Sequence, residues 1–98
     1  MDGRIRQRNR AILLEILLSN PCVMCKTDDI LVLEFDHLRD KRQHVTTMAL
    51  SRNSVAAIMA EVFKCRILCS NCHTIETRRG SNDYRWIFSE GHEVDVVR

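Results

Sequence analysis

Large aromatic side chains are scarce in this chain of 98 residues, which has three phenylalanines, one tryptophan and one tyrosine. A domain of this size with so few large rings buries a marginal hydrophobic core and usually needs an additional cross-link. The hydrophobic content of 45% and the charged content of 29% are ordinary, and they exclude wholesale disorder. We therefore expect one small α+β domain covering residues 1–98, stabilised by something besides its core.

Long apolar runs are also missing. The longest, from Ile12 to Leu18, is interrupted by Glu15 and falls far short of the roughly 20 residues that span a bilayer. The basic and then apolar start of the chain resembles a signal peptide only superficially, because no small-residue cleavage site precedes the first cysteine. We expect a mature cytoplasmic protein that makes no use of a membrane.

Hydrophobic periodicity predicts the secondary structure. Apolar residues at helical spacing indicate an amphipathic basic helix over about residues 3–19, which Pro21 ends. Further along the chain, the pattern predicts a β-rich strand at 30–35, a short second strand at 44–48, a helix begun by the SRNS segment at 51–54, and a helix at 70–79 stopped by Gly80. The extension at 81–98 has no clear pattern.

Opposite charges are segregated along the sequence. Basic residues are concentrated before residue 11, at 39–42 and at 64–85, whereas residues 28–36 are acidic. Basic segments around an acidic one are expected if a polyanion approaches a site that carries carboxylates. Solvated helix faces would give the same pattern, so charge alone does not decide between the two interpretations.

Five cysteines supply the strongest chemical signal, because four of them form two CxxC pairs, Cys22 with Cys25 and Cys69 with Cys72. Zinc takes four soft ligands in a tetrahedron, and each pair can present two thiolates from one turn. Disulfides and a redox pair are the alternatives; a chain without a secretory signal disfavours the first, and a redox site needs only one pair. We predict structural Zn²⁺, with Cys65 as a buried apolar residue outside the site.

A second group of residues joins Asp36 and His37, at the end of the predicted first strand, to His73 in the first turn of the last predicted helix. A carboxylate and an imidazole can hold one Mg²⁺ or Mn²⁺ and leave positions for phosphate oxygens and water, while a free histidine serves as general base. The alternative is that His37 is a core histidine and that His73 only caps or replaces a zinc ligand.

The segments PCVMC, LEFDH and KCRILCSNCHTIET, within residues 20–79, resemble the four-cysteine zinc subgroup of the HNH endonucleases, the ββα-metal nucleases. The resemblance implies a β-hairpin packed on a helix around a catalytic Mg²⁺ or Mn²⁺, here with the added N-terminal helix. By position it implies that Asp36 and His73 are metal ligands and that His37 is the base that activates water. Small stand-alone members occur in phages and bacteria, often near packaging functions, which suggests double-stranded DNA and a packaging or other protein as partners.

One position departs from the family pattern. Many members have an asparagine nine residues before the last histidine, where it braces the loop that carries the base, but this chain has Lys64 there. Asn71 lies between two cysteines and is not its equivalent by position. The candidates for phosphate contact are Arg39, Lys41, Arg42, Lys64, Arg78 and Arg79.

These observations predict a metal-dependent DNA endonuclease of low sequence specificity, and the resemblance implies that it leaves 3′-hydroxyl and 5′-phosphate ends. The alternative from another class is a zinc-stabilised module that binds nucleic acid or protein and has no catalytic activity. A redox or metal-buffering protein would require reactive thiols instead of a closed zinc site.

Overall fold

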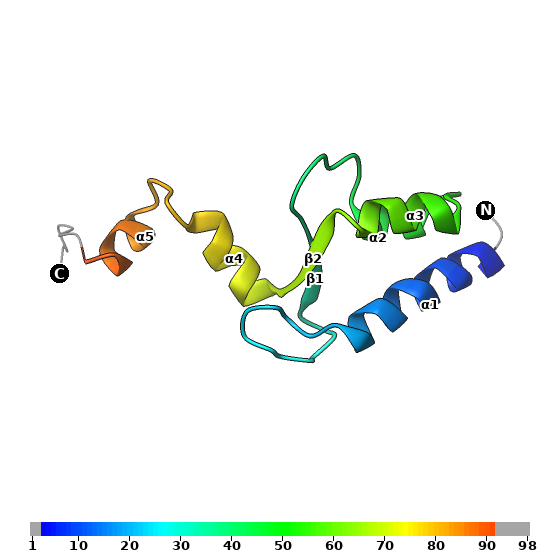
Figure 1. The fold of residues 1–98 in the computed structure, drawn as a ribbon, viewed down its shortest axis with the longest axis horizontal. Coiled ribbons are helices and arrows are strands. Elements are labelled where there is room, and N and C mark those ends of the chain that lie inside the picture. Colours follow the sequence, from blue (N-terminus) through cyan, green and yellow to red (C-terminus); the bar gives the residue numbers. More distant parts are fainter. Residues whose placement is uncertain (1–2, 92–98) are drawn as a thin grey trace.

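The computed structural model describes residues 3–91 and contains five helices and two strands within them. In chain order these are α1 (Gly3–Ser19), β1 (Leu33–His37), α2 (Val45–Ala49), α3 (Val55–Val62), β2 (Cys65–Cys69), α4 (Ser70–Arg78) and α5 (Tyr84–Ser89), as labelled in Figure 1. The architecture is therefore α+β, as predicted. Among the described residues, no helix combines the length and the apolar character needed to cross a bilayer.

The two strands form an antiparallel sheet at the centre of the molecule (Figure 1). Leu33 pairs with Cys69 at one end of the register, and His37 pairs with Cys65 at the other. Because α4 begins at the residue after β2, the sheet and the start of this helix form one continuous unit. Strand β1, with Glu34 and Asp36, is thus placed beside the end of β2 and the start of α4, which carry the last two cysteines.

The prediction of a second strand at 44–48 is wrong, because residues 45–48 belong to the short helix α2 and His44 is its N-cap. Val45, Thr46 and Thr47 are β-branched and so favour a strand locally. In the structure, however, Val45, Met48 and Ala49 are buried on one helical face, and this tertiary packing outweighs the local preference. The partner of β1 is instead β2, and the connection between the strands carries α2 and α3.

The predicted N-terminal helix is confirmed as α1, with the expected bounds. It packs against α2. These two helices lie with α3 at the end of the molecule opposite α5 in Figure 1. Asn9 is fully buried there, with its amide nitrogen directed at the carbonyl oxygen of Ala49 (3.4 Å). Ser54 caps α3 by accepting a hydrogen bond from the backbone N–H of Ala57.

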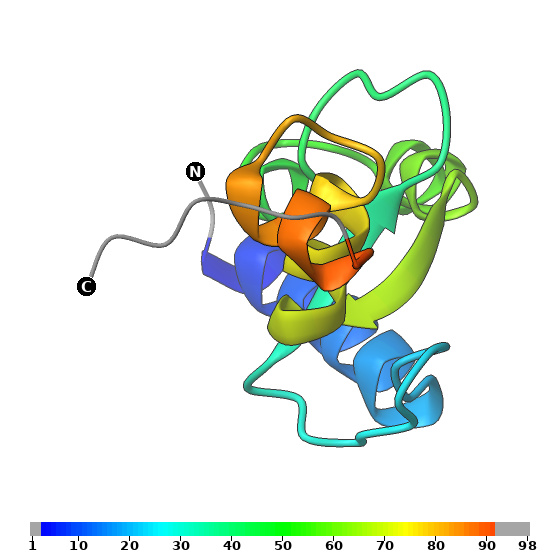
Figure 2. The same ribbon diagram turned by 90° about the vertical axis from the view of Figure 1, so that its left-hand side faces the viewer.

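Two small hydrophobic clusters replace a single large core. One lies around the cysteines and the sheet, the other lies among α1, α2 and α3, and Phe35 packs against both. The molecule is elongated, with extents of 56 × 26 × 24 Å, and α4 and α5 project along its long axis in front of the sheet (Figure 2). Helix α5 was not predicted; Asp83 caps it, and none of its residues is buried. The part of the acidic tail at 92–98, which includes His92, lies outside the described residues.

Candidate functional site

The two predicted cysteine pairs meet in one cluster. The sulfur atoms of Cys22, Cys25, Cys69 and Cys72 all lie within 4.8 Å of one another, and Cys25 Sγ is 3.7 Å from Cys69 Sγ. Zinc–sulfur bonds of about 2.3 Å put the corners of a tetrahedron about 3.8 Å apart, so the donor set and its spacing fit a metal ion such as zinc. Within residues 3–91 no other group of three or more such side chains is gathered in this way.

Local backbone contacts hold each pair in position. In the first pair, the N–H of Cys22 donates to Thr27 and the N–H of Lys26 donates back to Cys22, both at 3.0 Å, which closes a tight turn. The N–H of Val23 donates to the carbonyl of Ile67 and thereby attaches this turn to β2. The second pair spans the start of α4, where Cys69 is the N-cap.

The thiols of the cluster differ in acidity. Burial of Cys22 opposes ionisation, but backbone N–H groups of Cys25, Cys69 and Met24 outweigh it and lower its pKa to about 6. Cys72 has its pKa raised to about 12, first by its contact with Cys69 and then by burial. Cys22 therefore ionises more readily than Cys72, and a bound cation would favour the thiolate form of its ligands.

All five cysteines are free of disulfide bonds in the structure. Cys65 lies outside the four-sulfur cluster and is partly buried, and its sulfur contacts the carbonyl oxygen of Glu61 at 3.4 Å. Burial raises the pKa of Cys65 to about 11. Its location agrees with the prediction that it packs as an apolar residue and does not join the cluster.

Asp36 and His73 are brought together. Nε2 of His73 is 3.1 Å from Oδ1 of Asp36, while Nδ1 of His73 is 3.8 Å from a carboxylate oxygen of Glu34. Glu34 and Asp36 share a face of β1, because side chains alternate along a strand. Two neighbouring ligands of an octahedral ion at about 2.1 Å lie about 3.0 Å apart. The Asp36–His73 pair therefore has the spacing of two adjacent ligands of a small divalent cation.

The second carboxylate oxygen of Asp36 accepts a 2.8 Å hydrogen bond from Arg66 Nε, and Asp36 raises the pKa of Arg66. Arg66 pairs with Asp36 in the strand register, which explains why they meet. Arg66 was not predicted from the sequence, because the second strand was expected at 44–48 and the partner of β1 is β2. A guanidinium here leaves one Asp36 oxygen for another ligand and puts a positive charge beside the carboxylate.

His37 lies on the opposite face of β1 from Asp36. Its ring is 8% exposed, and Nε2 lies 2.8 Å from Oε2 of Glu61 on α3. The contacts of the His37 ring thus run to α3, whereas those of the neighbouring Asp36 run to α4. Sequence analysis missed Glu61, although its position three residues after the buried Ile58 puts it on the buried face of α3.

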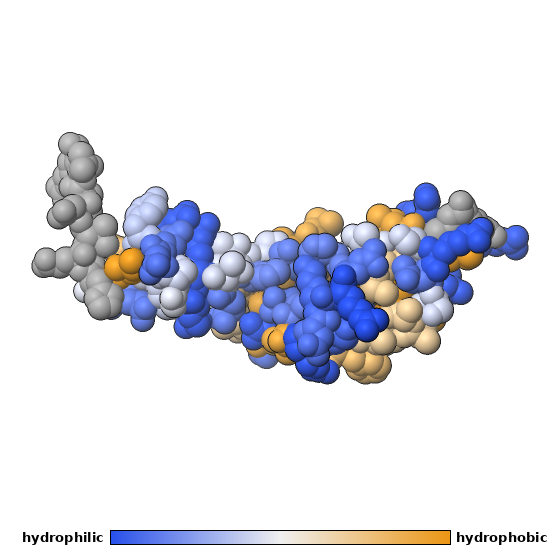
Figure 3. Space-filling view, turned by 90° about the horizontal axis from the view of Figure 1, so that it is seen from above, coloured by the Kyte–Doolittle hydropathy of each residue, from blue (hydrophilic) through white to orange (hydrophobic). Residues whose placement is uncertain are grey.

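The predicted phosphate-binding residues divide into two groups. Arg39, Lys41 and Arg42 lie on the exposed loop 38–44, which projects toward the viewer in the largely hydrophilic middle of Figure 3. The other three are engaged within the protein: Lys64 with Glu61, Arg78 with Asp83, and Arg79 with Glu76 and the ring of Trp86.

His44 was expected on a strand and is instead the N-cap residue of α2. It is exposed, with Nε2 3.2 Å from Nζ of Lys41.

Comparison of the chain with family models, with curated proteins and with solved structures finds no match. Membership of the HNH endonucleases therefore stays a prediction, and the site is interpreted from its own geometry.

Proposed function

We propose that this protein is a metal-dependent endonuclease that hydrolyses phosphodiester bonds of DNA with low sequence specificity. The observation that carries the proposal is the 3.1 Å contact between His73 and Asp36, the residue that precedes His37 in β1. A carboxylate on β1 and an imidazole on α4 converge at a point that the cysteine cluster would fix. A module that only binds DNA has no need of this arrangement.

The cysteine cluster has a structural role in the proposal. Zinc held by Cys22, Cys25, Cys69 and Cys72 would tie the first turn to the end of β2 and the start of α4. This keeps His73, in the first turn of α4, opposite Asp36. The ion at this cluster has a closed set of four ligands, so it contributes to the position of the site and not to the reaction.

A second cation, Mg²⁺ or Mn²⁺, is proposed at Asp36 and His73. When bound, such an ion supplies charge stabilisation to the phosphate and to the departing 3′ oxygen. An imidazole beside a carboxylate suits Mn²⁺ at least as well as Mg²⁺. Arg66, on the other oxygen of Asp36, is placed to hold a phosphate oxygen by a charge-assisted hydrogen bond.

His37 is the proposed general base. Its Nε2 is engaged by Glu61, so Nδ1 is the nitrogen that remains to take a proton from the attacking water. The hydroxyl oxygen of that water forms a bond to phosphorus, the bond from phosphorus to the 3′ oxygen breaks, and the released oxygen takes up a proton from solvent. The products are a 5′-phosphate and a 3′-hydroxyl.

A second candidate is a zinc-stabilised module that binds nucleic acid without cleaving it. Its supporting observations are the low exposure of His37 and the occupation of one Asp36 oxygen by Arg66. Both are compatible with residues that only stabilise the fold. The exposed basic loop 38–44 would serve this function equally well.

Cleavage of supercoiled plasmid distinguishes the two candidates. The wild type, His37→Ala, His73→Ala and the matched control His44→Ala would be compared with Mg²⁺, with Mn²⁺ and with neither. Omission of these ions is preferable to strong chelation, because a chelator also removes zinc from the cysteines. The zinc content and the circular dichroism spectrum of each variant establish that the fold is intact.

We expect nicked or linear product from the wild type and His44→Ala, only with the added ion, and a loss of about 100-fold or more in the other two variants. Equal cleavage by His37→Ala would exclude His37 as the base. Retention of DNA without cleavage by any of the proteins would favour the binding module.

A further inference from the structure

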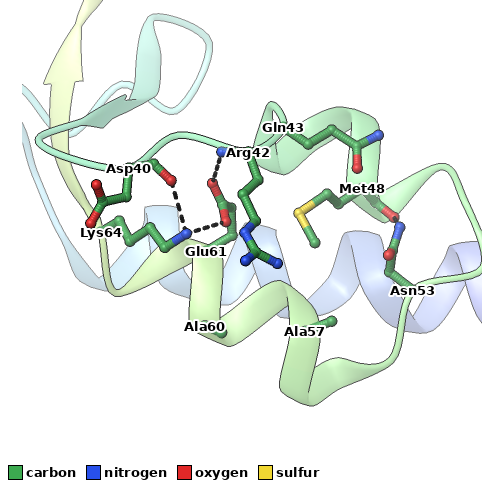
Figure 4. Close-up of a pocket in the computed structure, with 9 residues that line it drawn as sticks. All are labelled: Asp40, Arg42, Gln43, Met48, Asn53, Ala57, Ala60, Glu61 and Lys64. Atoms are coloured by element: carbon green, nitrogen blue, oxygen red, sulfur yellow. Dashed lines mark hydrogen bonds and ion pairs between the residues drawn. The ribbon is translucent and has the colours of Figure 1, made fainter.

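Glu61 is a buried carboxylate with an unusually complete set of partners. Only 3% of the surface of Glu61 is exposed to solvent. Oε1 lies 2.9 Å from Nζ of Lys64, while Oε2 accepts from the backbone N–H of Arg42 at 3.0 Å and lies 2.8 Å from Nε2 of His37. Figure 4 shows the contacts with Lys64 and Arg42 at the wall of a pocket between the 38–44 loop and α3.

These contacts keep Glu61 ionised. Lys64 contributes most and the N–H of Arg42 next; together with His37 they outweigh burial and lower the pKa of Glu61 to about 2. An ionised carboxylate only accepts hydrogen bonds, so the neutral ring of His37 must carry its proton on Nε2 to bond with it. The unprotonated nitrogen of the ring is then Nδ1, and it is the one able to accept a proton.

Lys64 acts on His37 only through Glu61. Its ammonium donates to the carbonyl oxygen of Asp40 at 3.0 Å as well as to Glu61, so it ties the start of the basic loop to α3 (Figure 4). Its side chain is 20% exposed. Lys64 therefore holds the carboxylate in place, and this role is separate from the predicted contact with DNA phosphate.

A purely structural role would not need this group. Burying a carboxylate with its counter-charge is often no better for stability than burying an apolar side chain of similar volume. Ile58 precedes Glu61 on the same buried face of α3, and the adjacent cluster is apolar. A leucine at position 61 would extend that cluster, so the carboxylate has to be explained by what it binds.

We propose that Glu61 is a positioning residue: held by Lys64 and the backbone of Arg42, it fixes the ring of His37 with Nδ1 as the proton acceptor. This inference rests on the proposed function, because it assigns a role within the same reaction. It makes a separate claim about the protonation of one ring that does not require the enzyme to turn over.

Long-range proton–nitrogen correlation spectra report which ring nitrogen carries the proton. The zinc-loaded full chain would be measured without Mg²⁺ or Mn²⁺, with the pH raised until the signals of His37 are those of a neutral ring. The signals of His37 are assigned from the spectrum of His37→Ala. We expect the Nε2–H form in the wild type and a mixture of both forms in Glu61→Leu. A wild-type ring protonated on Nδ1 would overturn the proposal without the use of any variant.

Steady-state cleavage provides the second readout. Glu61→Leu should lose about 100-fold or more in kcat with KM nearly unchanged, since the base and not DNA binding is affected. Glu61→Gln keeps a neutral acceptor, so it should retain the Nε2–H form and have an intermediate kcat. Glu15→Gln, on the exposed face of α1, is the matched control and should behave as wild type.

The outcomes separate the two proposals. If the wild type cleaves and a folded Glu61→Leu cleaves equally well, the role of Glu61 is excluded while the nuclease assignment stands. If the wild type does not cleave, the proposed function fails and the catalytic role of Glu61 fails with it. If Glu61→Leu does not fold, the wild-type spectrum and the kcat of Glu61→Gln decide the question.

Discussion

At the scale of single residues, Lys26 adopts a left-handed backbone conformation with φ of 67° in the first cysteine turn. Non-glycine residues pay about 1 kcal/mol or more for this conformation. Glycine avoids that cost, so Lys26→Gly should be more stable than Lys26→Ala by about 1 kcal/mol in the free energy of unfolding.

Alanine is the appropriate reference because both substitutions remove the hydrogen bond from Nζ of Lys26 to the carbonyl of Val23. Urea denaturation of the two zinc-loaded variants, followed by circular dichroism, measures the difference. Equal midpoints would mean that the turn relaxes without cost and that the left-handed backbone is not a source of strain.

Cys65 is predicted to react slowly with alkylating agents in the zinc-loaded protein. Burial, with Glu61 and Asp36 next, raises its pKa from 9.0 to about 11, and the thiolate is the reactive form. At pH 7.5 its thiolate population should therefore be about 100-fold below that of an ordinary cysteine, and its reactivity should increase as the pH approaches 11.

Alkylation with iodoacetamide, followed by peptide mass spectrometry, identifies which cysteines are modified and how fast. With zinc bound, none of the five should react quickly at pH 7.5. Rapid modification of four or more thiols in the zinc-loaded protein would contradict the closed site and favour the redox or metal-buffering alternative.

At the scale of elements, the metal site is expected to hold β1, β2 and α4 together. Cys72→Ser removes one of four ligands, and structural zinc in small domains contributes on the order of 10–16 kcal/mol to folding. We expect this variant to lose its zinc, which a chromogenic chelator would report, and to lose most of its sheet and the start of α4.

Cys65→Ser is the control, because it changes a cysteine at the start of β2 that lies outside the cluster. It should keep one zinc per chain and a circular dichroism spectrum like that of the wild type. Loss of zinc from Cys65→Ser, or a native spectrum for a zinc-free Cys72→Ser, would show that the cluster does not organise these elements.

Elements defined by local signals could be predicted from the sequence. The N-terminal helix has helical spacing and ends before Pro21, α3 begins at its Ser54 cap, and α4 ends near Gly80, whose φ is +70°. The strand at 44–48 was wrong because its β-branched residues carry a local preference that packing against α1 and α3 overrides. No local pattern reveals that packing.

The candidate site also contains residues that could be predicted from the sequence and residues that could not. Spacing along the sequence sufficed to predict the four cysteines, and it also brought Asp36 and His73 into one hypothesis. Arg66 and Glu61 were not predicted, because their roles depend on the pairing of β1 with β2 and on the side of β1 that α3 covers. Such partners follow from strand register and helix packing, which a single sequence does not specify.

At the scale of the whole molecule, the elongated shape separates charged regions. The exposed loop 38–44 carries three basic side chains beside the sheet, and the rest of the loop adds one acidic residue, Asp40. In contrast, Arg78, Arg79 and Arg85 on and after α4 are paired with Glu76 or Asp83. We therefore expect the loop, and not the end of α4, to contribute most of the attraction for DNA.

The dependence of DNA binding on salt tests this distribution. A plot of the logarithm of the DNA-binding constant against the logarithm of the salt concentration has a negative slope. Each phosphate contact that is lost should reduce the magnitude of this slope by about 0.9 for duplex DNA. The double variant Arg39→Ala, Lys41→Ala should therefore have a slope about 1.8 smaller than that of the wild type. The measurement is fluorescence anisotropy of a labelled duplex at several salt concentrations, without Mg²⁺ or Mn²⁺ so that no cleavage occurs.

A charge-matched control separates local contacts from a general loss of positive charge. Arg52→Ala, Arg85→Ala removes the same charge from the turn before α3 and from α5, and its slope should stay within about 0.5 of the wild type. If both double variants lower the slope equally, the attraction arises from net charge. The loop would then not be the surface on which DNA approaches Asp36 and His73.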